Sequence, residues 1–291
     1  MNNYFKYLPV SKDDEAWGLT VLNAGCTHIE SCKEYPSKLH PEHHNFDWNN
    51  GRVLQEYQVI YITNGQGIFE SDSQKKTNVS AGTMIFLFPN ERHRYRPDDH
   101  IGWDEYWIGL RGNIIENLVL AGHIKPENAC INIGCHSDLL HLFNTIIENT
   151  KSELPGYQPL ISGAALHLLG ALHASTRQNS ITLNDSHIIN KAQLLFRANA
   201  KSCYSPQQAA LELQVGYSWF RKRFKNYTGL SPGQYFLQLK IEEAKMQLSK
   251  TDCSIKQIAY NLHFESAFYF SKIFKEKTGL KASEYRLRSK V

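Results

Sequence analysis

The sequence predicts an α+β protein of two domains: an antiparallel β-barrel with following helices over residues 1–178, and an all-α domain with two helix-turn-helix units over residues 187–291. Three observations predict this fold. Residues 17–108 hold short strands separated by turns, residues 205–286 repeat one pattern twice, and charge is divided unequally between the two parts. Residues 179–186 are mostly polar and are expected to be the linker.

Short apolar segments bounded by Gly, Pro, Asn and Asp predict β-strands in the first domain. The expected strands are residues 17–22, 57–63, 67–71, 77–79, 83–88, 93–96 and 102–108. Asn64-Gly65-Gln66-Gly67 predicts a hairpin turn between the second and the third of these strands. Several short strands at hairpin spacing predict a small antiparallel barrel or a double-sheet roll.

Helices are expected after Gly112, and the longest covers residues 158–177. This helix is apolar nearly all round, and a helix without a polar face needs cover on both sides. One side would pack on the barrel. The other would pack on the same helix of a second subunit and form a homodimer, with Leu168 and Leu172 in the contact. Full burial within one subunit is the alternative.

One pattern is written twice between Ser205 and Arg286. The two copies match at a spacing of about 50 residues, for example at Phe224 and Phe274. Such self-similarity is typical of a structural repeat. Each copy predicts a short helix that begins at a capping serine, a turn, and a second helix that buries aromatic residues, which together form a helix-turn-helix.

Charge separates a nucleic-acid binder from a plain helical bundle. Residues 186–291 hold 18 Lys and Arg against 7 Asp and Glu, a net charge of +11, although the whole chain is only +4. Residues 1–185 therefore carry a net charge of −7. A basic domain with Lys and Arg on the second helix of each unit is typical of nucleic-acid binding. The alternative is that these are ordinary solvated helix faces.

The C-terminal motifs carry a family resemblance. GLSPGQY (229–235), KIEEA (240–244), SIKQIA (254–259) and FKEKTGLKASEYR (274–286) resemble the DNA-binding domain of the AraC/XylS family of bacterial transcription regulators. The resemblance implies a transcription regulator that binds double-stranded DNA and RNA polymerase, with activation expected and repression as the alternative. His263 departs from the family, which usually has glycine there, and Ala282 stands where the family often has proline.

In this reading the second helix of each unit enters the DNA major groove. Residues of its exposed face would then touch base edges or phosphates. The expected base contacts are Ser218, Arg221 and Lys222 in the first unit and Phe268, Ser271 and Lys272 in the second, and the expected phosphate contacts are Lys225 and Lys275. The helix of about 18 residues between the units would span roughly 27 Å, which suits recognition helices in successive major grooves roughly 34 Å apart.

The N-terminal motifs resemble the cupin-like ligand-binding domain of many AraC-family regulators. The matching segments are RVLQEYQVIYITNGQGIFE (52–70), GTMIFLFPNERHRY (82–95) and GWDEYWIGLRG (102–112). The resemblance implies a small-molecule effector in the barrel, and aromatic faces beside polar groups suit a sugar. The expected ligand-binding residues are Arg52, Glu56, His93, Tyr95, Trp103, Glu105 and Trp107. A place for Trp107 in the core instead of the pocket is an equal alternative.

No metal and no cofactor are expected, and the protein is not expected to be an enzyme. Metal-bearing cupins carry an HxH motif and a glutamate on one strand, followed by a later histidine. His93 matches the later histidine, but no HxH precedes Gly65, and His40, His43 and His44 come too early. Two alternatives remain: a metal-dependent cupin enzyme fused to a DNA-binding domain, and a regulator whose N-terminal domain binds a protein.

The composition predicts a cytoplasmic protein that does not enter the membrane. No apolar targeting segment follows Met1, and no run of 18 apolar residues occurs. The six cysteines form neither a CxxC pair nor a zinc-binding spacing, so reduced and packed thiols are expected.

Overall fold

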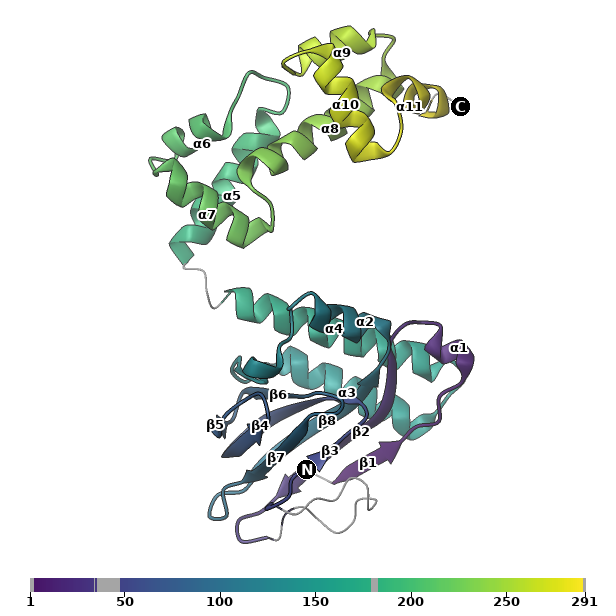
Figure 1. Ribbon diagram of the computed structural model, residues 1–291, viewed down its shortest axis with the longest axis vertical. Helices are drawn as coiled ribbons and strands as arrows, with labels where there is room; N and C mark the ends of the chain where they lie inside the picture. Colours follow the sequence, from purple (N-terminus) through teal and green to yellow (C-terminus); the bar gives the residue numbers. More distant parts are fainter. Residues whose placement is uncertain (1–2, 34, 36–47, 179–182, 290–291) are drawn as a thin grey trace. The chain divides into compact units, whose positions relative to one another are not determined.

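The computed structural model describes residues 3–33, 35, 48–178 and 183–289. The chain divides into two compact units, residues 1–176 and residues 177–291. Within the described residues, all strands belong to the first unit and the second unit is helical (Figure 1). The predicted α+β fold of two domains is confirmed.

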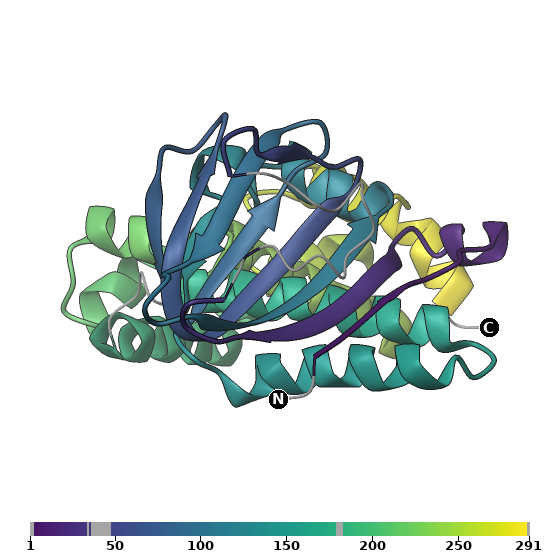
Figure 2. The ribbon, with the colours of Figure 1, turned by 90° about the horizontal axis from the view of Figure 1, so that it is seen from below.

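The first unit is built on antiparallel strands that lie side by side (Figure 2). They are β1 (Tyr4–Tyr7), β2 (Thr20–Ile29), β3 (Arg52–Val53), β4 (Tyr57–Ser71), β5 (Thr77–Ser80), β6 (Thr83–Leu87), β7 (Arg92–Pro97), β8 (Trp103–Arg111) and β9 (Cys130–Asn132). One path of hydrogen-bonded neighbours runs β1-β2-β8-β4-β6-β9. Off this path, β5 and β7 pair with β4, and β3 pairs with β7.

β4 is one strand of 15 residues, so the predicted hairpin turn at residues 64–67 is wrong. Its first half pairs with β6 and β8, and its second half pairs with β5 and β7. The pairing with β8 shifts between Ile62 and Asn64. Gly65 follows with a φ of +82°, and a Cβ there would lie 2.1 Å from the carbonyl oxygen of Gly102. This glycine therefore marks a bulge, which lets one strand join two sheets.

Helices of the first unit pack on the sheet from one side (Figure 1). The helices that contribute to the core of this unit are α2 (Asn113–Leu120), α3 (Ser137–Ser152) and α4 (Tyr157–Gln178). The short helix α1 (Lys12–Glu15) and the 3₁₀ turn η2 (Pro126–Asn128) bury no residue. Phe143 of α3 stacks on Tyr61 of β4, with 6.0 Å between ring centroids. α4 adds Ile161 and Ala165 to the same core.

Leu168 and Leu172 also belong to this core and are at most 3% exposed. Their predicted place in a contact between subunits is therefore wrong. Because α4 is apolar nearly all round, its sequence could not show which side faces the sheet. On its outer side, Leu160 is 55% exposed and Leu166 is 44% exposed.

The second unit consists of helices throughout its described residues. They are α5 (Leu183–Ala198), α6 (Pro206–Glu212), α7 (Tyr217–Thr228), α8 (Pro232–Lys250), α9 (Ile255–Asn261), α10 (Ala267–Thr278) and α11 (Ala282–Ser289). α5 begins inside the expected linker 179–186, so residues 183–186 are helical instead. Asp185 is buried in the first turn of α5 and lies 3.4 Å from Nε of Arg223. A carboxylate near a helix N-terminus is favourable, and this one also ties α5 to α7.

The sequence repeat is a structural repeat. α6 and α9 begin with the same capping box, formed by Ser205 with Gln208 and by Ser254 with Gln257. Two separate aromatic cores result, one around α5, α6 and α7 and one around α9 and α10. α8 contributes Phe236 to the first core, and residues of the second half of α8 pack in the other core. No helix in the described part of the chain is long and apolar enough to span a membrane.

Candidate ligand site and nucleic-acid interface

Alternate residues of β8 line the interior between the two sheets. Trp103, Glu105 and Trp107 occupy every second position, and each is at most 8% exposed. Tyr106 faces the other way and contacts Phe143 of α3, with ring centroids 6.0 Å apart. Because successive side chains of a strand point to opposite faces, the three residues face away from the helices and into the interior.

Trp107 lies across Gly25 of the neighbouring strand β2. The two residues are register partners, and a Cβ on Gly25 would lie 2.3 Å from the indole ring. A larger residue at position 25 would therefore displace the ring. The absence of a side chain on β2 gives Trp107 its position in the interior.

Arg52 is held over an aromatic cluster. β3 pairs with β7 so that Arg52 lies opposite His93. Its Nε donates to Nε2 of His93 at 3.1 Å, and its Nη2 donates to the hydroxyl of Tyr95 at 2.7 Å. The rings of Tyr35, Tyr95 and Trp103 lie 6.0 to 6.2 Å apart, centroid to centroid. The structure thus brings together Arg52, His93, Tyr95, Trp103 and Glu105 of the predicted ligand-binding residues.

Burial changes the protonation of two of these residues. Burial, together with the Arg52 guanidinium, lowers the pKa of His93 to about 3. Nδ1 of His93 faces the carbonyl of Glu91 at 3.1 Å, which suits a neutral ring that donates from Nδ1 and accepts at Nε2. Burial raises the pKa of Glu105 to about 7, although the Arg52 guanidinium and the neighbouring Trp103 and Tyr35 lower it.

Three buried polar atoms of this interior have no hydrogen-bond partner within the described residues. They are Nε1 of Trp103, Oε2 of Glu105 and Oδ1 of Asn23. Leaving a buried donor or acceptor unsatisfied costs about 1–3 kcal/mol. A molecule that supplied the missing partners would therefore gain binding free energy from each of them.

Glu56 lies apart from the Arg52 cluster, with residues that the sequence did not suggest. Its Oε1 accepts from Nδ2 of Asn23 at 2.6 Å and from Nε2 of Gln58 at 3.2 Å. Asn23, Gln58 and Tyr35 were missed as site residues. A signal existed for Gln58, because it is a polar residue next to the apolar run of β4.

The described residues contain no group of three His, Cys, Asp or Glu side chains that could hold a metal ion. Both ring nitrogens of His93 already face groups of the protein, so this residue does not suit a metal ligand. His40, His43 and His44 lie outside the described residues.

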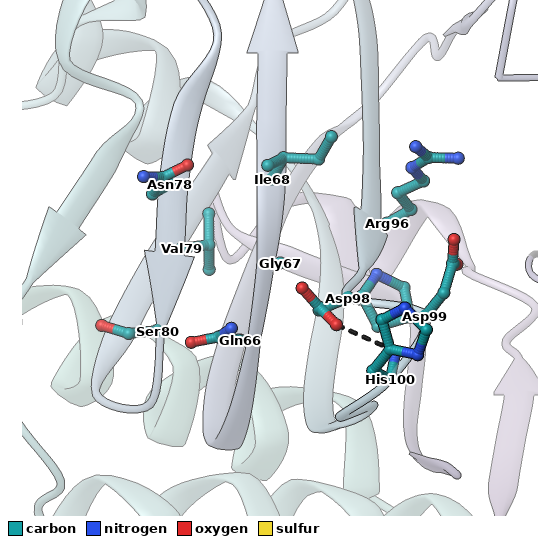
Figure 3. A pocket seen from close by; sticks show the side chains of 11 residues that line it. Gln66, Gly67, Ile68, Asn78, Val79, Ser80, Arg96, Asp98, Asp99 and His100 are labelled. Carbon is teal, nitrogen blue, oxygen red and sulfur yellow. Dashed lines mark hydrogen bonds between the residues drawn. The ribbon is translucent and has the colours of Figure 1, made fainter. Parts of the chain in front are cut away.

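A shallow polar depression of about 360 Å³ lies on the outer face of the strands β4, β5 and β7 (Figure 3). Gln66 and Ile68 of β4, Asn78 of β5 and Arg96 of β7 line it, and beyond β7 the backbone N–H of His100 donates to Asp98 at 2.9 Å. None of its polar side chains is buried. These groups can be hydrated, so the depression is a weaker ligand site than the interior.

The second unit presents matching exposed faces on α7 and α10. Phe220 and Phe224 of α7, and Phe270 and Phe274 of α10, are fully buried. All eight predicted DNA contacts are exposed on the other sides of these helices: Ser218, Arg221, Lys222 and Lys225 on α7, and Phe268, Ser271, Lys272 and Lys275 on α10. Phe268 is 81% exposed, which nothing in the packing of this unit requires.

Two family models match the chain. Residues 33–169 match the model described as an AraC-like ligand binding domain, and residues 209–288 match the model described as a helix-turn-helix domain. The chain is an AraC-family transcription regulator.

Three relatives of this AraC-family regulator align over most of both chains. The MmsAB operon regulatory protein of Pseudomonas aeruginosa is 27% identical and covers 80% of this chain and 76% of its own length. The raffinose operon transcriptional regulatory protein RafR of Pediococcus pentosaceus is 25% identical, with coverages of 83% and 88%. The lactose operon transcription activator of Staphylococcus xylosus is 23% identical, with coverages of 81% and 86%.

The turn of each helix-turn-helix in this AraC-family regulator contains a left-handed residue that is not glycine. His263 has a φ of +53° after α9, and Gln214 has a φ of +56° after α6. A residue with a Cβ is strained in this region, although histidine tolerates it better than most. His263 thus adopts a left-handed conformation at the position where the family usually has glycine.

Proposed function

We propose that the regulator is controlled by a sugar that binds in the interior between the two sheets. The observation that carries the proposal is the pair of buried polar groups on Trp103 and Glu105, neither of which forms a well-aligned hydrogen bond through its indole Nε1 or its Oε2. The indole N–H is a donor and the carboxylate oxygen is an acceptor, and they lie two residues apart on one face of β8. A hydroxyl group can accept from the first and donate to the second.

Other features of the interior support a molecule with several hydroxyl groups. Oδ1 of Asn23 is a further acceptor without a partner in the described residues. The ring of Trp107 gives a flat apolar surface of the kind that packs against the C–H face of a sugar. Arg52 already donates hydrogen bonds to His93 and Tyr95, so its guanidinium is less available to an anionic ligand. Two relatives are named for the raffinose and lactose operons.

A panel of sugars tests this proposal by thermal unfolding of the full chain. Raffinose, lactose and their component monosaccharides are the first candidates. A ligand present at about 100 times its dissociation constant should stabilise the folded protein by about 2.7 kcal/mol. Trp103→Phe should reduce the stabilisation because it removes the indole donor, and Glu105→Gln should reduce it because the amide has one acceptor oxygen where the carboxylate has two. Trp17→Phe is the matched control, because Trp17 is 64% exposed.

Two results would contradict the proposal. One is a sugar that binds equally well to wild type and to both interior variants. The other is a panel in which no sugar stabilises the protein, while a protein partner protects the fluorescence of Trp103 from quenching. The second result would favour the alternative in which the first unit binds a protein.

The DNA-binding part of the proposal rests on α7, α8 and α10. We propose that α7 and α10 read successive major grooves through the eight exposed residues. α8 has 19 residues, about 28 Å of helix, and the groove repeat is roughly 34 Å. The helices are basic on the exposed side, and the unit carries the positive charge of the chain.

We further propose that the protein acts in the cytoplasm as a homodimer that contacts RNA polymerase and activates transcription. The outer face of α4 supports the dimer, because Leu160 is 55% exposed on it. A relative named as a transcription activator supports the direction of control. Transcription from a target promoter, measured with purified polymerase with and without the sugar, tests the activation.

A further inference from the structure

A cleft of about 270 Å³ lies outside the sheet interior, between α4 and the segment that runs from α2 to β9. Its walls are aliphatic: Leu118, Ile124, Ile131, Leu166, Leu169 and Leu172. A cavity of about 150 Å³ lined by such residues holds a benzene ring. The cleft is nearly twice as large, which corresponds to a bicyclic ring or a short aliphatic chain.

The polar side chains of the cleft carry no negative charge. His123, Asn128, His173 and Thr176 complete the lining, and no carboxylate is part of it. The rings of His123 and His173 meet edge to face, with centroids 4.9 Å apart. Imidazole and amide groups can donate hydrogen bonds, whereas the hydroxyl of Thr176 already donates to the carbonyl of His173 at 2.9 Å. A lining that offers donors and no negative charge favours a ligand with an anionic acceptor.

Gly170 keeps the cleft open. It lies inside α4, and no atom lies within 4 Å of the position that its Cβ would take. Glycine inside a helix costs about 0.5–1 kcal/mol relative to alanine. The packing of the described residues does not require that glycine, and a side chain placed there would project from the wall of the cleft into open space.

We propose that this cleft binds a small carboxylic acid with an aromatic or short aliphatic body, with its carboxylate at His123 and His173. The site goes beyond the proposed sugar site, from which it is separated by the sheet and by the buried side of α4. Thr176, the last residue of the first unit, lines the cleft. A ligand here therefore touches the end of α4, where the chain leaves this unit.

The first test shows whether the ligand binds in this cleft. 1-Naphthoate is titrated into the full chain by calorimetry, and Gly170→Leu is compared with Gly163→Leu. Both glycines lie in α4 with open space around them, so both variants should fold, but only Gly170 lines the cleft. We expect Gly170→Leu to weaken binding at least tenfold and Gly163→Leu to leave it within twofold. Absence of binding to wild type, or equal effects of the two variants, would overturn the proposal.

The second test compares the affinity for a carboxylic acid with the affinity for a neutral ligand of similar shape. 1-Naphthalenemethanol has the same ring system and a neutral head. We expect wild type to prefer the acid, and His123→Phe to remove most of this preference while the alcohol binds as before. Equal preference in wild type and variant would overturn the assignment of the head group. Saturation with a sugar that binds the interior should leave naphthoate binding unchanged, whereas direct competition would place both ligands in one site and overturn the proposal.

Discussion

Nε of Arg52 donates a hydrogen bond to Nε2 of His93 at 3.1 Å, and this bond requires a neutral histidine. A protonated ring would turn a donor toward a guanidinium, so the two positive groups would repel each other inside the protein. The position of Arg52 over Tyr95 therefore depends on the protonation state of its neighbour.

Acid should destabilise the first unit through His93. The folded-state pKa is about 3 and the unfolded value is about 6.5, so the unfolded chain binds more protons between these values. Stability is then lost as the pH falls below 6.5, by about 2 kcal/mol at pH 5. Urea unfolding at pH 7 and pH 5 checks this. His93→Gln keeps an acceptor without the titration, and its stability should change less between the two pH values.

Glu105 should act in the opposite direction. Its folded-state pKa of about 7 exceeds the unfolded value, so the folded chain binds more protons between pH 4.5 and pH 7. Stability should fall as the pH rises through this window, by about 3 kcal/mol at most. Glu105→Gln should remove the loss, so the variant should be the more stable protein at pH 8. The same variant should bind sugar less well, and a variant that gains both properties would contradict the assigned role.

Arg221 and Lys225 should differ in what they contribute to DNA binding. Both are exposed on α7, but a guanidinium near the helix start can pair with guanine O6 and N7. Arg221→Ala should cost about 1–3 kcal/mol on the cognate duplex and relax the preference at one base pair. Lys225→Ala should weaken binding to cognate and scrambled duplexes alike. Equal losses on both duplexes for Arg221→Ala, at one fixed salt concentration, would exclude base readout by this residue.

His263→Gly should stabilise the second helix-turn-helix. The left-handed conformation at φ of +53° costs roughly 1–2 kcal/mol for a residue with a Cβ, and the greater freedom of glycine in the unfolded chain offsets part of this gain. A net gain of up to about 1 kcal/mol is expected by urea unfolding. Lys256→Gly, on an exposed turn of α9, should lose about 1 kcal/mol instead. Destabilisation by both glycines would mean that the His263 side chain is needed for packing.

Leu160→Glu should produce monomers if α4 pairs two subunits. A charge on a packed helix face is costly to desolvate, and Leu160 lies on the outer side of α4, 55% exposed. Leu120→Glu is the control, because Leu120 is 84% exposed on α2. Sedimentation of wild type and both variants decides the matter, and a dimeric Leu160→Glu would exclude this face. Leu168→Glu should unfold the first unit instead.

The repeat and the charge difference were sufficient to predict the second unit, because both are properties of residue order alone. The bend of β4 at Gly65 was not predictable in this way. Asn-Gly is typical of a hairpin turn, and only the pairing of β4 with β8 up to Gly65 and with β5 and β7 after it shows that the strand continues. The side of α4 that faces the sheet was equally hidden, because Leu160 and Leu168 are chemically the same. Asn23 joins the ligand site through its pairing across β2 and β8, a long-range relation that no local pattern contains.

α8 contributes side chains to two cores at once. It therefore fixes the distance between the two recognition helices, α7 and α10, and also the rotation of one relative to the other about the axis of α8. One residue inserted into α8 would turn the second recognition helix by about 100° relative to the first. One base pair inserted into the operator would turn its second half by roughly 34°. Neither change can compensate for the other. Under the proposed DNA-binding mode, the protein therefore sets the number of base pairs between the two recognised segments of the operator. New target promoters can arise by changes of base sequence but not by changes in this spacing.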